Sequence, residues 1–192
     1  MNVKDYLKER YVQNEHNKDL TGNVSAGICF GLCVLWANEK VRSPNNTPKQ
    51  RINAITSNSM GRKFAIRIQS SWNTNNSWKK EKALWDEKGL TLGKYNDYNI
   101  KQITEFSKEL INKQRNGSFT ALGWYKQVGA GGHQLISYLD NKTFILYDPN
   151  GGEFHIPTHT VCDFLKSYWV DLRNEANLPK IGRLSMASIA VY

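Results

Sequence analysis

The chain has 192 residues, of which 40% are hydrophobic and 22% charged, a composition typical of a soluble globular protein large enough to bury a core without staples. We therefore predict one domain over residues 1–192. The 26 Lys and Arg residues outnumber the 17 Asp and Glu residues, which gives a formal net charge of +9. The basic residues are scattered without interleaved aromatic residues, and no nucleic-acid motif is present. The charge therefore favours an acidic protein partner, and we expect no nucleic acid.

The three cysteines and the N-terminus bear on the cellular compartment. Cys29, Cys33 and Cys162 are too few for a closed disulfide framework, so we expect reduced thiols and a cytosolic place of action. The first residues lack the apolar segment of a signal peptide, and no stretch approaches the length of a membrane span. We expect no transmembrane segment, and any secretion would proceed without a cleavable signal peptide.

Helical patterns dominate the first half of the chain. We predict a short helix at residues 3–10, a polar loop at 13–26 and a buried, almost wholly apolar helix from Ile28 to about Lys40. Further helices are predicted at 49–69, 79–88 and 100–115, separated by a loop at 44–48 and an Asn/Ser-rich stretch at 72–78, with Asn99 as the N-cap of the last helix.

The second half changes from helical periodicity to the alternation of strands. Strands are predicted at 119–127, 133–139, 143–148 and from 184 to 192, with a helix at 158–173. Helices followed by an antiparallel sheet indicate an α+β fold.

The hairpin between the second and third strands brings a histidine close to an aspartate. If Asp140 and Asn141 form a two-residue turn, His133 lies directly opposite Asp148, with both side chains on one face. If the turn is instead Asn141 and Lys142, the pairing shifts by two residues and the contact becomes diagonal.

Cys29 is the candidate nucleophile. It follows Gly27 by two positions and begins the apolar helix. A helix N-terminus and a nearby histidine can lower a cysteine pKa from about 8.5 to roughly 3–4. Cys33 lies one turn further into the apolar helix, and Cys162 lies in an amphipathic helix, so both are predicted to be core residues.

His133 and Asp148 complete a possible catalytic set. His133 follows a glycine-rich run and is the candidate general base, whereas Asp148 orients this histidine, caps the turn that follows it, or does both. Two cysteines in an i, i+4 relation and one distant histidine do not form a zinc set, and no phosphate-binding or dinucleotide glycine motif occurs. We therefore expect no metal and no cofactor.

These residues resemble the YopT/AvrPphB family of papain-like cysteine peptidases. The shared pattern is Gly27-x-Cys29-x-x-Leu32 with Trp36, then His133, then the segment Asp-Pro-Asn-Gly-Gly-Glu-Phe at 148–154. The resemblance implies a papain-like fold in which N-terminal helices, including a central helix starting at the catalytic cysteine, pack on a C-terminal antiparallel sheet. It also implies that Cys29 is the nucleophile, His133 its base and Asp148 the orienter.

Asn23 stands six residues before Cys29, where papain-like enzymes place a glutamine that donates to the oxyanion. An asparagine amide can do the same, so Asn23 is either an oxyanion-hole residue or a plain loop asparagine.

The resemblance implies a thiol endopeptidase, delivered as a bacterial effector or toxin, that cleaves a cytosolic protein of a host cell or of a rival bacterium. In the second case an immunity protein would be the natural partner.

Other acyl-transfer activities use the same residues, namely glutamine deamidation, transglutamination and cell-wall amide cleavage. Cell-wall hydrolases of this fold usually carry Asp-Cys-Ser-Gly, where this chain has Ile28-Cys29-Phe30-Gly31. A non-catalytic binding module is a third alternative, which the intact Cys, His and Asp disfavour.

Overall fold

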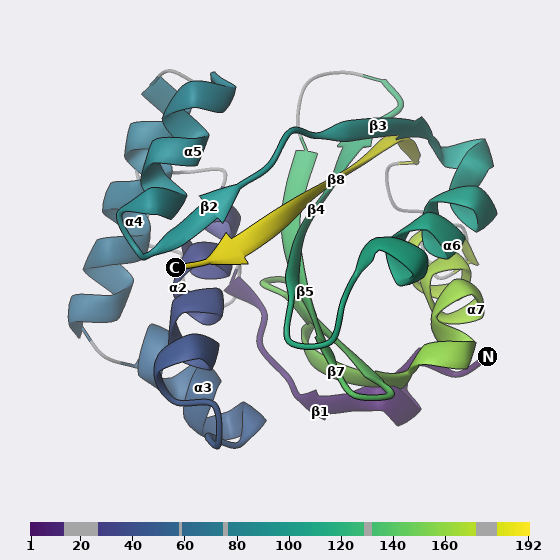
Figure 1. Ribbon diagram of the computed structural model, residues 1–192, viewed down its shortest axis with the longest axis horizontal. Coiled ribbons are helices and arrows are strands. Elements are labelled where there is room, and N and C mark those ends of the chain that lie inside the picture. Colours follow the sequence, from purple (N-terminus) through teal and green to yellow (C-terminus); the bar gives the residue numbers. More distant parts are fainter. Residues whose placement is uncertain (14–26, 58, 75–76, 129–131, 172–179) are drawn as a thin grey trace.

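One antiparallel sheet separates two groups of helices in the computed structural model (Figure 1). The structure describes all residues except 14–26, 58, 75–76, 129–131 and 172–179. Four helices lie on one side of the sheet: α2 (Cys29–Arg42), α3 (Pro48–Thr56), α4 (Ser59–Thr74) and α5 (Trp78–Asp86). On the other side lie α6 (Ile103–Lys113) and α7 (Val161–Lys166). In the described ranges, no helix is long and apolar enough to cross a membrane.

The helices differ from the predicted ones mainly at their ends. The helix predicted at 49–69 is two helices, because α3 ends at Thr56 and α4 begins at Ser59. A capping box of Thr47 and Gln50 begins α3, and Asn99 caps the short 3-10 helix η3 (Ile100–Gln102) that leads into α6, as predicted. The helix predicted at 158–173 consists of three short pieces, η4 (Thr158–Thr160), α7 and the π-helical η5 (Ser167–Asp171).

The sheet has the strand order β1-β7-β6-β5-β4-β8-β2, and β3 also pairs with β8. The predicted strands are present as β4 (Phe119–Lys126), β5 (Gly132–Asp140), β6 (Thr143–Asp148) and β8 (Ile181–Val191). The remaining strands β1 (Leu7–Glu9), β2 (Leu90–Leu92), β3 (Asn96–Asn99) and β7 (Gly152–Pro157) were not predicted. The helix predicted at 3–10 is wrong beyond its first turn: the 3-10 helix η1 (Val3–Tyr6) gives way to β1, which pairs with β7.

The turn between β5 and β6 corrects the favoured hairpin register. Asp140 pairs with Thr143, so Asn141 and Lys142 form the turn. Asn141 has a φ of 54°, a left-handed conformation that asparagine tolerates well, and its N–H donates to Asn116 Oδ1 at 2.5 Å. His133 and Asp148 are therefore diagonal neighbours rather than direct partners, as in the alternative register.

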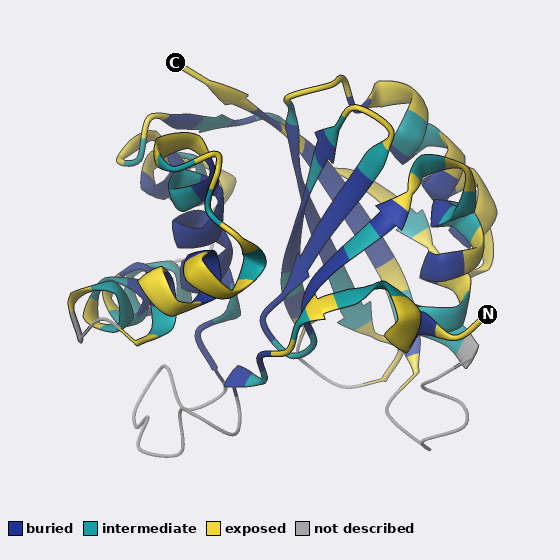
Figure 2. Ribbon diagram, turned by 90° about the horizontal axis from the view of Figure 1, so that it is seen from below, coloured by how far each residue is buried: buried dark blue, intermediate teal, exposed yellow. Residues whose placement is uncertain are grey.

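Each face of the sheet buries its own hydrophobic core (Figure 2). The core beneath α2 includes Cys33, which is fully buried as predicted, and the opposite core lies beneath α6 and α7. Cys162 departs from its prediction, because it is only half-buried on α7.

A buried carboxylate joins the helices α2 and α3 to the sheet. Glu153 on β7 is fully buried and accepts hydrogen bonds from Trp36 Nε1 at 2.9 Å and from Arg51 at 2.6 and 3.1 Å. The ring of His155 adds a contact at 2.7 Å. Burial raises the pKa of Glu153, but His155, Arg51 and Trp36 outweigh it and lower the pKa to about 2. The carboxylate therefore stays charged and fixes α2, which begins at Cys29, against the strand that follows Asp148.

Replacing Glu153 by glutamine should destabilise the protein severely. The change would leave the guanidinium of Arg51, which is 2% exposed, without its counter-charge. Loss of one partner of a buried pair reduces the free energy of unfolding by roughly 3–5 kcal/mol. Urea denaturation measures this, and Glu87→Gln is the matched control, because Arg67 and Glu87 form an exposed pair with the same 2.6 Å distance. The control should lose less than about 1 kcal/mol. Equal small losses in the two variants would contradict the assigned role.

Candidate active site

Cys29 is the first residue of α2 and is half-buried at its N-terminus. Gly27 precedes it with a φ of 121°, a conformation that L side chains rarely adopt. The N–H of Ile28 donates to Gln13 Oε1 at 2.8 Å, which ties the approach to the helix to a side chain that is itself buried. The thiol thus sits where the helix dipole favours a negative charge.

Gln69 on α4 supplies the cap that the local sequence lacks. Ile28 makes no side-chain capping bond, and the Oε1 of Gln69 instead accepts from Phe30 N–H at 2.9 Å and from Gly31 N–H at 3.5 Å. A Cβ at Gly31 would collide with the Ala65 carbonyl, so glycine is what allows α4 to approach α2 this closely. Sequence analysis missed Gln69, because nothing in the pattern around it indicates a contact 39 residues away.

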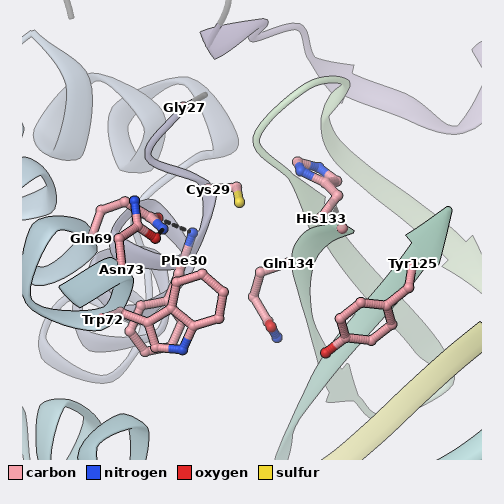
Figure 3. A pocket seen from close by; sticks show the side chains of 10 residues that line it. Gly27, Cys29, Phe30, Gln69, Trp72, Asn73, Tyr125, His133 and Gln134 are labelled. Atoms are coloured by element: carbon pink, nitrogen blue, oxygen red, sulfur yellow. Dashed lines mark hydrogen bonds between the residues drawn. The ribbon is translucent and has the colours of Figure 1, made fainter. Parts of the chain in front are cut away.

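His133 and Asp148 meet across the β5–β6 hairpin despite the diagonal register. The Nε2 of His133 lies 2.7 Å from Asp148 Oδ1, and both residues are buried. Diagonal neighbours on one face remain within reach of long side chains. Because Nε2 is taken by Asp148, Nδ1 is the ring nitrogen left for Cys29. In Figure 3 the Cys29 thiol and the His133 ring lie on opposite sides of the same opening, on α2 and β5 respectively.

Asp148 has three hydrogen-bond partners. Besides His133, its Oδ1 accepts from Asn150 N–H at 2.6 Å, and its Oδ2 accepts from the Tyr168 hydroxyl at 2.8 Å. Burial raises the pKa of Asp148, but His133, Asn150 and Tyr168 together bring it below its ordinary value. Asp148 therefore bonds both to the histidine and to the turn that follows it, which is compatible with the two predicted roles together. Tyr168, on the π-helical turn after α7, was missed, because no sequence signal places it near β6.

The thiol and the imidazole shift each other's pKa in opposite directions. Burial raises the pKa of Cys29, but its hydrogen bond to His133 and the charge of that ring lower it below the ordinary value. Burial alone would lower the pKa of His133, whereas Asp148 and Cys29 raise it to about 10. These shifts favour a thiolate–imidazolium pair at neutral pH.

Cys33 lacks these features. Burial raises the pKa of its thiol well above the ordinary value, and the charges of Cys29 and Asp148 raise it further. Its Sγ donates to the Gln134 carbonyl at 3.3 Å. Cys33 is therefore a protonated residue of the core.

A cavity of about 200 Å³ opens beside Cys29 and His133. Its walls are mainly aromatic and amide side chains: Phe30, Trp72 and Tyr125, with Gln69, Asn73 and Gln134 (Figure 3). Asn23 lies outside the described residues. No group of three His, Cys, Asp or Glu residues suited to a metal ion occurs in the part of the chain that the structure describes.

A peptidase family model, described as Yersinia/Haemophilus virulence surface antigen, matches residues 74–188. The chain belongs to the YopT/AvrPphB family of cysteine peptidases. The stretch that the family model matches contains His133 and Asp148, whereas Cys29 lies before it. No curated protein matches the chain.

One solved structure shows that the chain has the expected fold. The Pseudomonas avirulence protein AvrPphB aligns with a TM-score of 0.76 at 16% identity, over 98% of this chain and 100% of that one. The predicted α+β papain-like architecture is therefore confirmed. The YopT domain of the Pasteurella multocida PfhB2 toxin aligns at 15% identity over 91% of this chain and 90% of that one, with a TM-score of only 0.36.

The pH dependence of Cys29 alkylation by iodoacetamide should show the ion pair. Because the Cys29 pKa is lowered, the thiolate should persist well below the pH at which an ordinary thiol is protonated, and His133 should keep its proton up to about pH 10. Asp148→Asn removes a charge that raises the His133 pKa, so the step of the alkylation profile at which the imidazolium loses its proton should move from about pH 10 to lower pH. Peptide mass spectrometry of the alkylated protein distinguishes alkylation of Cys29 from alkylation of Cys33 and Cys162. An unchanged profile in Asp148→Asn would contradict the assigned coupling.

Tyr168→Phe should produce a smaller shift in the same direction. Without the hydroxyl, the pKa of Asp148 rises, so its carboxylate is protonated at a higher pH and supports the imidazolium less well. A hydrogen bond to a charged group contributes about 1.5–3 kcal/mol, and the free energy of unfolding should fall by a similar amount. Tyr6→Phe is the control. The centres of the Tyr6 and Phe164 rings are 5.6 Å apart, as are those of Tyr168 and Phe164, but no hydrogen bond joins Tyr6 to Asp148 among the described residues. A loss of stability with no shift of that step of the alkylation profile would reduce Tyr168 to a packing residue.

Proposed function

We propose that the chain is a thiol endopeptidase in which Cys29, His133 and Asp148 form the catalytic triad. The observation that carries the proposal is the placement of the Cys29 thiol at a helix N-terminus, opposite a histidine whose far nitrogen is 2.7 Å from a buried carboxylate. This is the arrangement that nucleophilic catalysis by a cysteine requires. Membership of a peptidase family supports the same reading.

The reaction follows from the charges in the site. The Cys29 thiolate attacks the scissile carbonyl carbon and forms a carbon–sulfur bond. The His133 imidazolium then gives its proton to the leaving amine as the carbon–nitrogen bond breaks. His133 next takes a proton from water, which attacks the thioester and releases the acid and Cys29. Asp148 keeps the His133 Nε2–H oriented throughout, so that Nδ1 faces the sulfur.

The oxyanion of the tetrahedral intermediate needs two donors. We assign the backbone N–H of Cys29, at the free end of α2, as one of them and the Asn23 amide as the other. We assign this role to Asn23 because it stands six residues before Cys29 in the sequence.

The substrate is proposed to be a protein in the cytosol of a target cell, either a host or a rival bacterium. The chain would reach that cell through a specialised secretion system, without a cleavable signal peptide. An acidic protein surface suits the net charge of +9, and an immunity protein would be the partner if the target is a rival bacterium.

Comparison of N-termini across the proteome tests this function. The protein and its Cys29→Ala form are expressed in a bacterium and in a eukaryotic cell, and new N-termini are identified by mass spectrometry. New termini that depend on Cys29 are expected in at least one host. Glutamine residues heavier by about one dalton, without new termini, would instead indicate a deamidase, and glutamine–lysine crosslinks would indicate a transglutaminase. Identical proteomes in both hosts would reject catalysis by Cys29.

A further inference from the structure

The positive charge of the chain is concentrated in its helical half. Between Cys29 and Lys88 lie 11 of the 26 Lys and Arg residues but only four of the 17 Asp and Glu residues. This range comprises α2, α3, α4 and α5, which all lie on one side of the sheet (Figure 1). Nearly all of the net charge of +9 therefore belongs to one face of the molecule.

Two of these cations lie over one aromatic ring, and a third is near them. Arg67 Cζ lies 4.5 Å from the centre of the Phe64 ring on α4, and Lys88 Nζ, just after α5, lies 3.5 Å from the same centre. Arg42, the last residue of α2, is close enough to act electrostatically on Lys88. We call Arg42, Arg67 and Lys88 the distal basic cluster.

The distal basic cluster has more positive charge than its own carboxylate balances. Glu87 pairs with Arg67 at 2.6 Å, and both side chains are about half exposed. Burial lowers the pKa of Lys88, Arg67 and Arg42 lower it further, and Glu87 offsets this only in part. Three cations facing one carboxylate form a site that an added anion would stabilise.

The place of the cluster separates it from the catalytic residues. Cys29 and Arg42 are the two ends of α2, a helix of 14 residues. At 1.5 Å per residue these ends are about 20 Å apart. An extended peptide needs about six residues to span that distance. Arg67, by contrast, lies on α4 between Ala65 and Gln69, which both contact the first turn of α2. Only the Arg42 end of the cluster is therefore that far from Cys29. None of the three cations lines the cavity beside Cys29, so a ligand at the cluster would be a segment other than the one held in that cavity.

We propose that the distal basic cluster is an exosite that binds an acidic segment of the protein substrate outside the cavity beside Cys29. The proposal rests on the proposed endopeptidase function, because it takes the substrate to be a protein. A membrane surface is the rival occupant, because Val41 and Met60 on the same helices are also exposed, and the vesicle measurement below distinguishes the two. Phe64 lies beneath Arg67 and Lys88 and packs against the core. The ring is therefore not free to stack on a nucleobase.

Binding of a fluorescein-labelled decaglutamate peptide tests the exosite. The protein carries Cys29→Ala, so that binding is measured without turnover, and fluorescence anisotropy gives Kd at low and at physiological salt. The cluster variant combines Arg42→Gln, Arg67→Met and Lys88→Met, in which methionine preserves the packing on Phe64. The matched control removes three exposed lysines from the other side of the sheet, Lys101→Gln, Lys108→Gln and Lys166→Gln.

The cluster variant should bind the peptide about tenfold more weakly and with a smaller salt dependence, whereas the control should stay within about twofold. Glu87→Gln should tighten binding, because it removes the competing carboxylate. Equal weakening in the cluster variant and the control would overturn the proposal, since it would show a general effect of net charge. So would binding of phosphatidylserine vesicles or duplex DNA through the cluster in the absence of peptide binding.

The alkylation rate of Cys29 separates this proposal from the proposed function. The cluster variant with Cys29 intact should react with iodoacetamide as the wild type does, because none of the three cations lines the cavity beside the thiol. Normal alkylation with unchanged peptide binding would reject the exosite and leave the endopeptidase proposal standing. If no cleavage depends on Cys29 but the cluster variant still loses peptide binding, the endopeptidase proposal is rejected. The cluster would then be a binding site for an acidic ligand that has no role in catalysis.

Discussion

The buried carboxylate of Glu153 is the interaction on which the geometry of the molecule depends. Cys29, the proposed nucleophile, lies on a helix and His133 on a sheet, so the two can cooperate only if α2 is held at a fixed position against β5 and β6. Glu153 binds Trp36 and Arg51 from the helical side, and Trp36 also stacks on Tyr147, with ring centres 5.6 Å apart and an interplanar angle of 4°. A charged anchor of this kind tolerates little displacement, because any movement would strand an unpaired charge in the core.

The site then adds polar contacts that come from distant parts of the chain. Gln69 satisfies the first backbone amides of α2, and Gln13 binds the residue before Cys29. Tyr168 and Asn150 hold Asp148, which in turn holds His133. Each of these residues places a reacting group through a hydrogen bond, and together they stabilise the charges that a thiolate–imidazolium pair needs in a buried setting.

Much of the fold followed from local pattern, and the exceptions have clear physical causes. The apolar run after Cys29 and the alternation in β4, β5 and β6 are strong signals, because one face of each element is buried. The strand β7 was missed, since Asp-Pro-Asn-Gly-Gly reads as a turn and the strand begins at the last glycine. The N-terminal strand β1 has only three residues and exists because β7 offers it an edge. The favoured hairpin register was wrong by two residues, because Asn141 takes the left-handed position and Asn116, 25 residues away, binds its amide.

The sequence by itself determined the chemical parts of the site: Cys29 at a helix start, a strand histidine, the aspartate before Pro149, and the motif of the family. These are local features, in which neighbouring residues carry the signal. Only the tertiary structure decided that Trp36 and Arg51 both bind the buried carboxylate of Glu153, that Gln69 caps α2, and that Arg42, Arg67 and Lys88 lie near one another. Such contacts join residues far apart in the chain, and their energy depends on distance and burial, which a linear pattern does not contain.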